Sequence, residues 1–229
     1  ATFDQVNSEH APSHHVAKLL TQDPGYTNSN VETTLNRVGK FVYDDDDSDI
    51  TKLPTIGPYE MDNKAVYHGQ WKEGTRHGRG RQVWPDGTIY EGYWSKDMAN
   101  GRGRLIHADG DCYEGEWEND KVQGKGKYTH FNGGVYEGEW QDDQQHGEGV
   151  ETWPDRVKYE GNFVRGQKDG EGKFTWADGS TYEGEFRDNQ IHGKGVYRWA
   201  DGRVYEGQWE HNKKSGEGEF SWPDGKKYV

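Results

Sequence analysis

The sequence predicts an all-β protein, a single-layer, elongated antiparallel sheet built from repeated β-hairpins. A tyrosine recurs every 23 residues from Tyr67 to Tyr228 without an insertion. The residues that recur with it stand at even-numbered spacings, as residues on one face of a strand do. The chain has 33 glycines but only 29% hydrophobic residues, which excludes an ordinary core of aliphatic side chains.

Each repeat predicts one hairpin. With the recurring tyrosine as position 0, glycine stands at position 2 and an aromatic residue at position 4, which makes one strand. Glycines at positions 11 and 13, followed by Trp or His at position 17, make a second strand. We expect six residues to join the two strands. An Asp-Gly pair such as Asp86-Gly87 is expected to turn the chain into the next repeat, because glycine accepts a positive φ.

The glycines predict how the hairpins pack. Glycine weakens a strand, so its recurrence on the face that carries the rings indicates that rings lie against the backbone there. One hairpin cannot offset the entropy cost of ordering its residues, so neighbouring hairpins must stack as a solenoid. The rings assigned to this structural role are Tyr67, Tyr90, Tyr113, Tyr136, Tyr159, Tyr182, Tyr205, Trp71, Trp94, Trp117, Trp140, Phe163, Phe186 and Trp209.

The opposite face is expected to carry ion pairs between neighbouring strands. Carboxylates at position 1 would face basic residues at positions 12 and 14. Cross-strand ion pairs explain the recurrence of these charged residues better than pairs of catalytic acids do. The acids are Glu114, Glu137, Glu160, Glu183 and Glu206, and the basic residues are Arg79, Arg81, Arg102, Arg104, Lys125 and Lys127.

The chain divides into two regions. Residues 67–229 hold seven repeats and the start of an eighth, whereas residues 1–66 contain no tryptophan and form an N-terminal extension with short helices and an acidic linker. The capping box Ser29–Glu32, with Leu35 and Val38 at helical spacing and Gly39 behind them, predicts a helix. A second helix is predicted for Ser13–Thr21. The extension either caps the open edge of the first hairpin or is an arm that binds a partner.

The repeat unit resembles a known family. The pattern Y-E-G-E-W-x6-G-x-G-x3-W-x-D-G, as in Tyr113–Gly133 and Tyr205–Gly225, is similar to the MORN repeat (membrane occupation and recognition nexus). The segments Gly57–Tyr67 and Leu105–Gly110 look most like MORN proteins of ciliates and other flagellated protists. The resemblance implies a curved antiparallel sheet with an aromatic groove, in a cytoskeletal, ciliary or membrane-associated scaffold that is sometimes dimeric.

No pattern in the sequence predicts catalysis, a metal or a cofactor. Asp44–Asp47 and Asp49 lack the glycine and the glutamate of a calcium loop, so a solvated linker is expected. His107 and His130 replace Trp in consecutive repeats, either as a packing substitution or as a metal-binding or pH-sensitive pair. The single Cys112 excludes an intramolecular disulfide and fits a reducing, cytoplasmic compartment.

The repeated aromatic face is the predicted functional surface. A single-layer sheet has no second layer to cover it, and uncovered apolar patches mark interaction sites. We expect a helix or an extended segment of another protein to lie in this groove, and edge pairing after Tyr228 to offer a second mode, as a homodimer or heterodimer. The groove residues are Trp84, His107, His130, Trp153, Trp176, Trp199, Trp222, Tyr128, Phe174, Tyr197 and Phe220.

These features favour a non-enzymatic scaffold of a cytoskeletal or ciliary (axonemal) assembly. The alternatives are a phosphoinositide-binding membrane module and the regulatory part of a larger enzyme whose catalytic domain lies beyond Val229. The formal net charge of −13 argues against nucleic acid and anionic lipid as partners, because the field of the protein repels phosphate. An 18-residue apolar run, as a membrane-spanning helix needs, is absent from the sequence.

Overall fold

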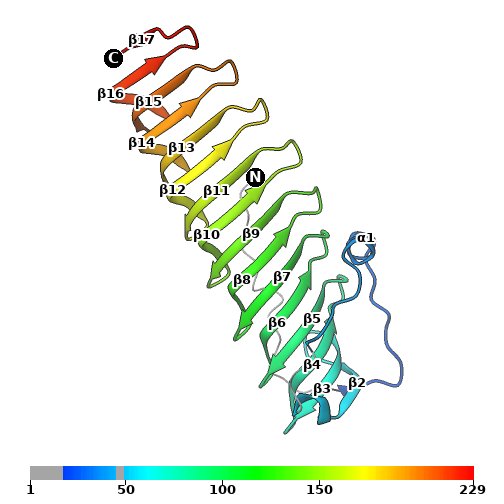
Figure 1. The fold of residues 1–229 in the computed structure, drawn as a ribbon. Helices are drawn as coiled ribbons and strands as arrows, with labels where there is room; N and C mark the ends of the chain where they lie inside the picture. The colour runs from blue at the N-terminus through cyan, green and yellow to red at the C-terminus, as the bar shows by residue number, and fades with distance from the viewer. Residues whose placement is uncertain (1–17, 45–48) are drawn as a thin grey trace. The chain divides into compact units, whose positions relative to one another are not determined.

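The computed structural model describes residues 18–44 and 49–229, in two compact units that are formed by residues 1–131 and 132–229. In each unit, antiparallel hairpins stack side by side in chain order (Figure 1). Unit 1 contains β1 (Lys18–Leu19), α1 (Ser29–Val38), the 3-10 helix η2 (Ile50–Lys52), β2 (Thr55–Glu60), β3 (Val66–Lys72), β4 (Thr75–Val83), β5 (Ile89–Ser95), β6 (Met98–Ile106), β7 (Cys112–Glu118) and β8 (Lys121–Thr129). Unit 2 contains β9 (Val135–Gln141), β10 (Gln144–Thr152), β11 (Lys158–Val164), β12 (Gln167–Thr175), β13 (Thr181–Arg187), β14 (Gln190–Arg198), β15 (Val204–Glu210), β16 (Lys213–Ser221) and β17 (Lys227–Tyr228).

The prediction of an all-β fold made of repeated antiparallel hairpins is confirmed. Every repeat contributes one seven-residue and one nine-residue strand, as in β11 and β12. The sheet of unit 1 starts before Tyr67, because β2 pairs with β3 and β1 pairs with β2. Among the described residues, no helix is long and apolar enough to cross a membrane.

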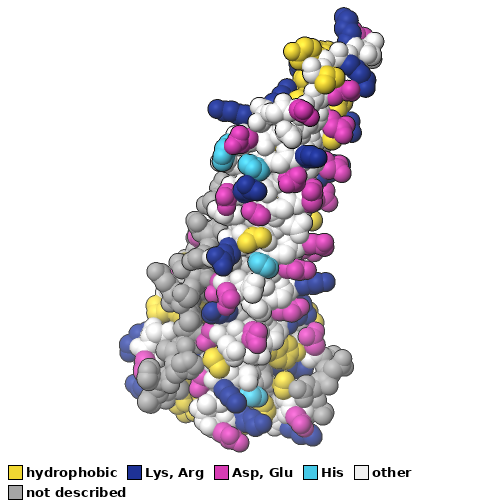
Figure 2. Space-filling model, turned by 90° about the vertical axis from the view of Figure 1, so that its left-hand side faces the viewer, with side chains coloured by type: hydrophobic (Ala, Val, Ile, Leu, Met, Phe, Trp, Pro, Cys, Tyr) yellow, Lys and Arg dark blue, Asp and Glu magenta, His cyan; other side chains and the backbone are white. Residues whose placement is uncertain are grey.

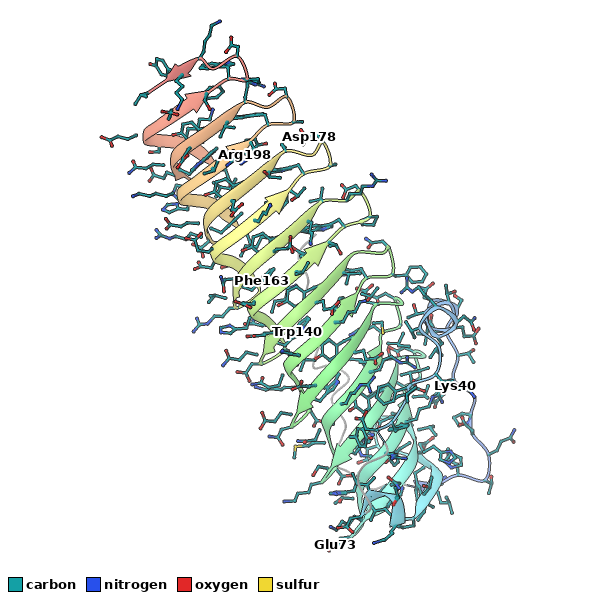
Figure 3. The ribbon with its side chains drawn as sticks, in the orientation of Figure 1. Lys40, Glu73, Trp140, Phe163, Asp178 and Arg198 are labelled. Carbon is teal, nitrogen blue, oxygen red and sulfur yellow. The ribbon has the colours of Figure 1, made fainter. Side chains whose placement is uncertain are left out.

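The expected six-residue connection within each hairpin is wrong. The two strands of a repeat run on until a two-residue turn joins them, as at Glu73-Gly74 between β3 and β4 (Figure 3). Both turn residues have positive φ, 49° and 63° at Asp142 and Asp143, which is the geometry of a type I′ hairpin turn. Gly, Asn and Asp occupy the second turn position throughout and tolerate this conformation.

The Asp-Gly loops between repeats form as expected. In the loop after β12, which contains Asp178 (Figure 3), the backbone N–H of Trp176 donates to Ser180 O and the N–H of Gly179 donates to Trp176 O, both at 3.0 Å. The Asp178 carboxylate accepts from the backbone N–H of Ser180 at 2.9 Å. The tryptophan therefore ends its strand and also closes the turn.

The recurring tyrosines lie on the recurring glycines, as the sequence predicts. Gly161 and Gly172 stand opposite each other in β11 and β12, and the ring of Tyr159 covers both. A Cβ added to Gly172 would lie 2.5 Å from the Tyr159 hydroxyl oxygen. That hydroxyl donates to the backbone carbonyl of Asn162 at 3.0 Å, so the buried polar group is satisfied.

Five of the buried tyrosine rings, Tyr67, Tyr90, Tyr136, Tyr159 and Tyr182, are also held between two aromatic rings of the position-4 series. Tyr159 makes edge contacts with Phe163 of its own repeat and Phe186 of the next, with ring centroids 5.2 and 5.0 Å apart. Tyr136 contacts Trp140 and Phe163 in the same way, and Figure 3 labels both rings. Edge-to-face contacts are a favoured geometry for aromatic pairs. Within each unit, these contacts hold each hairpin to its successor.

The helix predicted from the capping box is confirmed as α1, which ends at Gly39 as expected. Its cap is Asn28, one residue earlier than the capping box suggested, whose Oδ1 accepts from the backbone N–H of Asn30 at 2.9 Å. The helix predicted for residues 13–21 is wrong where the structure describes it, because Lys18–Leu19 forms β1 and pairs with Tyr59–Glu60. Residues 13–17 of that prediction lie outside the described residues.

Helix α1 packs on the face of unit 1 opposite the tyrosines. Its buried Val31 joins Val83, Ile89, Ile106 and Cys112, which are cross-strand neighbours there. The Thr34 hydroxyl donates to the carbonyl of Gly110 at 2.7 Å. The described part of residues 1–66 thus lies on a sheet face through α1 and also covers the edge of β3 through β2, as the capping alternative predicted.

The linker after α1 continues along the same face. Phe41 and Tyr43 lie over Arg102 and Arg79, with guanidinium carbons 5.3 and 5.6 Å from the ring centroids. The carboxylate of Asp44 pairs with Arg102 at 3.3 Å, so this residue is held on the sheet, whereas Asp45–Asp47 lie outside the described residues. The predicted cross-strand ion pairs form here too, with Arg102 Nη2 2.8 Å from Glu114 Oε1.

We expect Gly172→Ala to lower the free energy of unfolding by about 1–3 kcal/mol, because its Cβ would clash with a Tyr159 ring that two neighbouring rings hold in place. Urea unfolding measures the loss. The control is Glu171→Ala, an exposed side chain in the same strand, which we expect to change stability by less than about 0.5 kcal/mol. Equal effects of the two substitutions would contradict the packing argument.

We expect Cys112 to react with a thiol reagent far more slowly than a free cysteine, because its burial beneath α1 raises the pKa of the thiol to about 12. Val31→Asp should release α1 and speed the reaction, whereas Asn36→Asp, on the exposed side of the same helix, should leave it unchanged. Labelling kinetics at a fixed pH measures both. Rapid labelling of the wild-type protein would show that α1 does not protect the thiol.

Candidate partner-binding surface

Unit 2 carries a continuous row of aromatic rings at positions 15 and 17 of its repeats. We call this set the ring row. It consists of Trp153, Phe174, Trp176, Tyr197, Trp199, Phe220 and Trp222. Consecutive rings are in contact, with centroids 4.4–6.1 Å apart and planes tilted by 39–50°. The ring row therefore presents one apolar band across four repeats.

The strand register determines where the rings of the ring row lie on the sheet. Phe174 of β12 stands opposite Tyr182 of β13, and Tyr182 stands opposite Tyr197 of β14. Equivalent rings therefore occur once every two strands, in line across the sheet. The tryptophans follow directly at the strand ends, where the Asp-Gly loops begin.

The ring row remains open to solvent. Trp153, Trp176 and Trp199 are half-buried, as are the three rings between the tryptophans, and Trp222 is 38% exposed. The tyrosines at position 0 of the four full repeats of unit 2 are buried by contrast, with Tyr159 and Tyr182 at 0%, whereas Tyr228 at the start of the eighth repeat is exposed. The predicted groove residues of unit 2 thus lie together and can be reached.

The corresponding positions of unit 1 differ. Trp84 and Tyr128 are buried, and Gln82 and Leu105 occupy position 15 in the first two repeats. His107 and His130 are half-buried at position 17. The eleven residues predicted for one groove therefore divide between the two units, and the continuous half-exposed band belongs to unit 2.

His130 interacts with a carboxylate. Its Nδ1 lies 2.6 Å from Asp111 Oδ2, which also accepts from the Tyr128 hydroxyl at 2.9 Å. The other carboxylate oxygen accepts from the backbone N–H of Phe131 at 2.8 Å. The described residues hold no group of three or more His, Cys, Asp or Glu side chains placed to bind a metal ion.

Three cations at position 9 lie on the aromatic face. The repeat pattern does not predict them, because the residue at this position varies from repeat to repeat. Arg76 lies 4.4 Å from the Trp94 ring and donates to Gln82 Oε1 at 2.6 Å. Lys168 lies 5.3 Å from Trp153 and pairs with the buried carboxylate of Glu151. Lys214 lies 4.6 Å from both Trp199 and Phe220.

The opposite face of unit 2 is acidic. Glutamates stand directly opposite each other across β12–β13, at Glu171 and Glu185, and across β15–β16, at Glu206 and Glu219, and one of each pair is exposed and the other half-buried. Lys173 and Lys227 balance some of this charge, and Figure 2 shows acidic and basic side chains intermixed over one face of the molecule. Like charges in cross-strand pairs destabilise a sheet slightly and disfavour further anions.

Comparison with known proteins identifies the repeats. The family model described as MORN repeat matches residues 67–89, 90–112, 113–135, 136–157, 159–181, 182–202 and 205–227. Among curated proteins, no significant sequence match was found. The chain is similar to the SAS-4 (dCPAP) TCP domain of Drosophila melanogaster, solved in complex with a proline-rich motif of Ana2, at 19% identity over 66% of this chain and 82% of that one, with a TM-score of 0.40. It is also similar to the TCP10 domain of Danio rerio CPAP, solved with a STIL peptide, at 17% identity over 75% of each chain, with a TM-score of 0.41.

We expect Asp111→Asn to destabilise unit 1 by about 1–3 kcal/mol at neutral pH and to remove part of its acid sensitivity. Burial raises the pKa of this carboxyl, but the hydrogen bonds from His130, Phe131 and Tyr128 together hold it below its usual value. A carboxyl whose pKa is lower in the folded state stabilises the fold above its unfolded pKa, and this contribution is lost as the pH falls through the folded pKa.

Urea unfolding between pH 7 and pH 2.5 measures this contribution. The stability difference between wild type and Asp111→Asn should shrink towards the acid end of that range. Glu118→Gln removes an exposed carboxylate from the same unit and is the control. A difference that stays constant with pH would rule out the ionised Asp111 as its source.

Proposed function

The chain belongs to the MORN-repeat family, and from this premise we propose that it is a non-enzymatic scaffold that holds partner proteins on the ring row of unit 2. MORN repeats are protein-interaction or membrane-associating modules and are typically non-enzymatic. We place the scaffold in a cytoskeletal assembly of the cytoplasm, in a cilium or flagellum. This placement follows the roles that similar repeat proteins serve.

The observation that carries the proposal is the half-exposed ring row. Exposed apolar patches of this extent mark interaction sites, and aromatic residues dominate the energetic centres of protein interfaces. The other rings on this face of the four full repeats of unit 2, at positions 0 and 4, are buried. The ring row is the part of that face with apolar area left for a partner.

Charge favours a protein over an anionic membrane as the partner. The net charge of −13 and the facing glutamates of unit 2 repel anionic headgroups, which bind clusters of Lys and Arg. Edge pairing after β17 remains part of the proposal as a second mode of association, with another copy or a different chain.

The experiment is affinity capture with wild type and with Trp176→Ala/Trp199→Ala, followed by cross-linking mass spectrometry of the native assembly. We expect the variant to lose at least about 90% of the partner, because truncation of a central aromatic anchor costs 2 kcal/mol or more. Cross-links from wild type should map to the loops beside the ring row. Circular dichroism should still show a folded sheet.

Glu183→Ala/Glu206→Ala changes two exposed side chains on the opposite face of unit 2 and is the matched control, which should capture the partner as wild type does. Equal capture by the ring-row variant would overturn the proposal. Flotation of the wild-type protein with anionic liposomes would favour the membrane alternative instead.

A further inference from the structure

We propose that the ring row binds a proline-rich segment in the polyproline II conformation, with an acidic residue placed at Lys214. The inference rests on the proposed function and specifies its partner. Its basis is the spacing of the rings, the unpartnered indole N–H groups of the ring row and the single cation there that has no carboxylate.

The ring row has a fixed repeat distance. Equivalent rings recur once every two strands, because Phe174, Tyr197 and Phe220 alternate with Tyr182 and Tyr205 in the strand register. Neighbouring strands lie about 4.8 Å apart, so equivalent rings are spaced by about 9.6 Å. Trp153, Trp176, Trp199 and Trp222 occur at the same interval in the sequence and so share this spacing.

The polyproline II helix matches that distance. It has three residues per turn with a rise of about 3.1 Å, so every third residue returns to the same side after about 9.3 Å. The three intervals from Trp153 to Trp222 span about 29 Å. Nine consecutive residues of polyproline II span about 28 Å. A partner in this conformation would present one residue to each tryptophan.

Other backbone conformations fit less well. Seven residues of an α-helix advance about 10.5 Å, which accumulates an error of nearly 3 Å over the same three intervals. An extended strand covers one interval in about three residues, and its side chains alternate between two faces, so consecutive rings would meet opposite sides. The spacing of the ring row therefore selects for polyproline II.

The ring row also offers hydrogen-bond donors that suit this backbone. In the described part of the chain, the indole Nε1–H groups of Trp176, Trp199 and Trp222 donate to no protein acceptor. In contrast, the Nε1–H of Trp209, at position 4, donates to Gly195 O at 3.2 Å. A polyproline II segment has no internal hydrogen bonds, so its carbonyl groups are free to accept from regularly spaced donors.

Lys214 indicates where the partner carries a negative charge. Arg76 and Lys168 bind Gln82 and Glu151, which occupy position 15 in their repeats. The two residues at position 15 nearest to Lys214 are aromatic, Tyr197 and Phe220. Among the described residues, no carboxylate forms an ion pair with Lys214, so an acidic residue of the partner would complement it.

The experiment uses the full chain and a fluorescent peptide of about twelve residues, enough for four turns. The peptide consists of prolines with one glutamate near each end, so that either orientation can bring an acid to Lys214. A second peptide has glycine and serine in place of proline, and a third has glutamine in place of glutamate. Fluorescence anisotropy measures affinity, and the NMR signals of the indole N–H groups report the site.

We expect the proline peptide to bind at least about 10-fold tighter than the glycine-serine peptide, which is flexible. Trp176→Ala/Trp199→Ala should weaken binding at least about 10-fold, and the Nε1–H signals of Trp176 and Trp199 should shift in wild type. Trp176→Phe/Trp199→Phe keeps the rings without their donors and should give an intermediate loss. Lys214→Met should weaken the glutamate peptide several-fold and leave the glutamine peptide unchanged.

Equal binding of the proline and glycine-serine peptides, or wild-type affinity in the ring-row variants, would overturn the inference. If no proline peptide binds but the ring-row variant still loses its captured partner, polyproline II is wrong and the scaffold proposal stands. If the captured partner is also unaffected, both fail.

Discussion

The rest of this structure depends on the packing of a tyrosine ring against two glycines of its own hairpin. The ring can lie flat on the sheet only where both facing residues lack a Cβ, as Gly161 and Gly172 do beneath Tyr159. The exposed edges of that ring are then covered by Phe163 and by Phe186 of the next repeat. Tyr182, which contacts a ring of the next repeat, is 0% exposed, and Tyr205, whose one ring contact among the described residues is its own Trp209, is 7% exposed. Stacking therefore completes the burial of the rings, and aliphatic side chains contribute little.

This constraint leaves other positions of the repeat free to vary, and the variation separates the two units. Val83, Ile89, Ile106 and Cys112 make one face of unit 1 apolar, and α1 packs there. Unit 2 has Thr152, Lys158, Thr175 and Thr181 at the equivalent places, which offer a helix no apolar surface. Positions 15 and 17 show the reverse difference, since they are aromatic in unit 2 except at Glu151 and mixed in unit 1. Hairpins of the same backbone structure can thus bind α1 in unit 1 and leave an aromatic surface open in unit 2.

Features that depend on the 23-residue period could be predicted from the sequence. Features that depend on a single residue or on contacts with remote parts of the chain could not. Strand faces, the tyrosine–glycine packing and α1 follow from spacing and capping chemistry. The two-residue turns could not be predicted because their first residues, which include Glu73, Lys96, Arg165 and His211, have a positive φ that is uncommon for these residue types. The strand at Lys18–Leu19 depends on pairing with β2, which is remote in the sequence. Exposure of a ring likewise depends on its neighbours, so the eleven groove residues could not be divided between the units beforehand.

The two faces of unit 2 have opposite consequences for association. Glu171 opposite Glu185, and Glu206 opposite Glu219, carry like charges that make stacking of one copy on another through this face unfavourable. The ring row has apolar area, and Lys168, Arg203 and Lys214 are placed over its rings, with Arg203 paired to Asp201. Glu151 neutralises Lys168, and among the described residues Lys214 is the one of these three cations without a carboxylate partner. In the proposed complex, repulsion on one face directs the partner to the other, and Lys214 sets the position of the partner along the ring row.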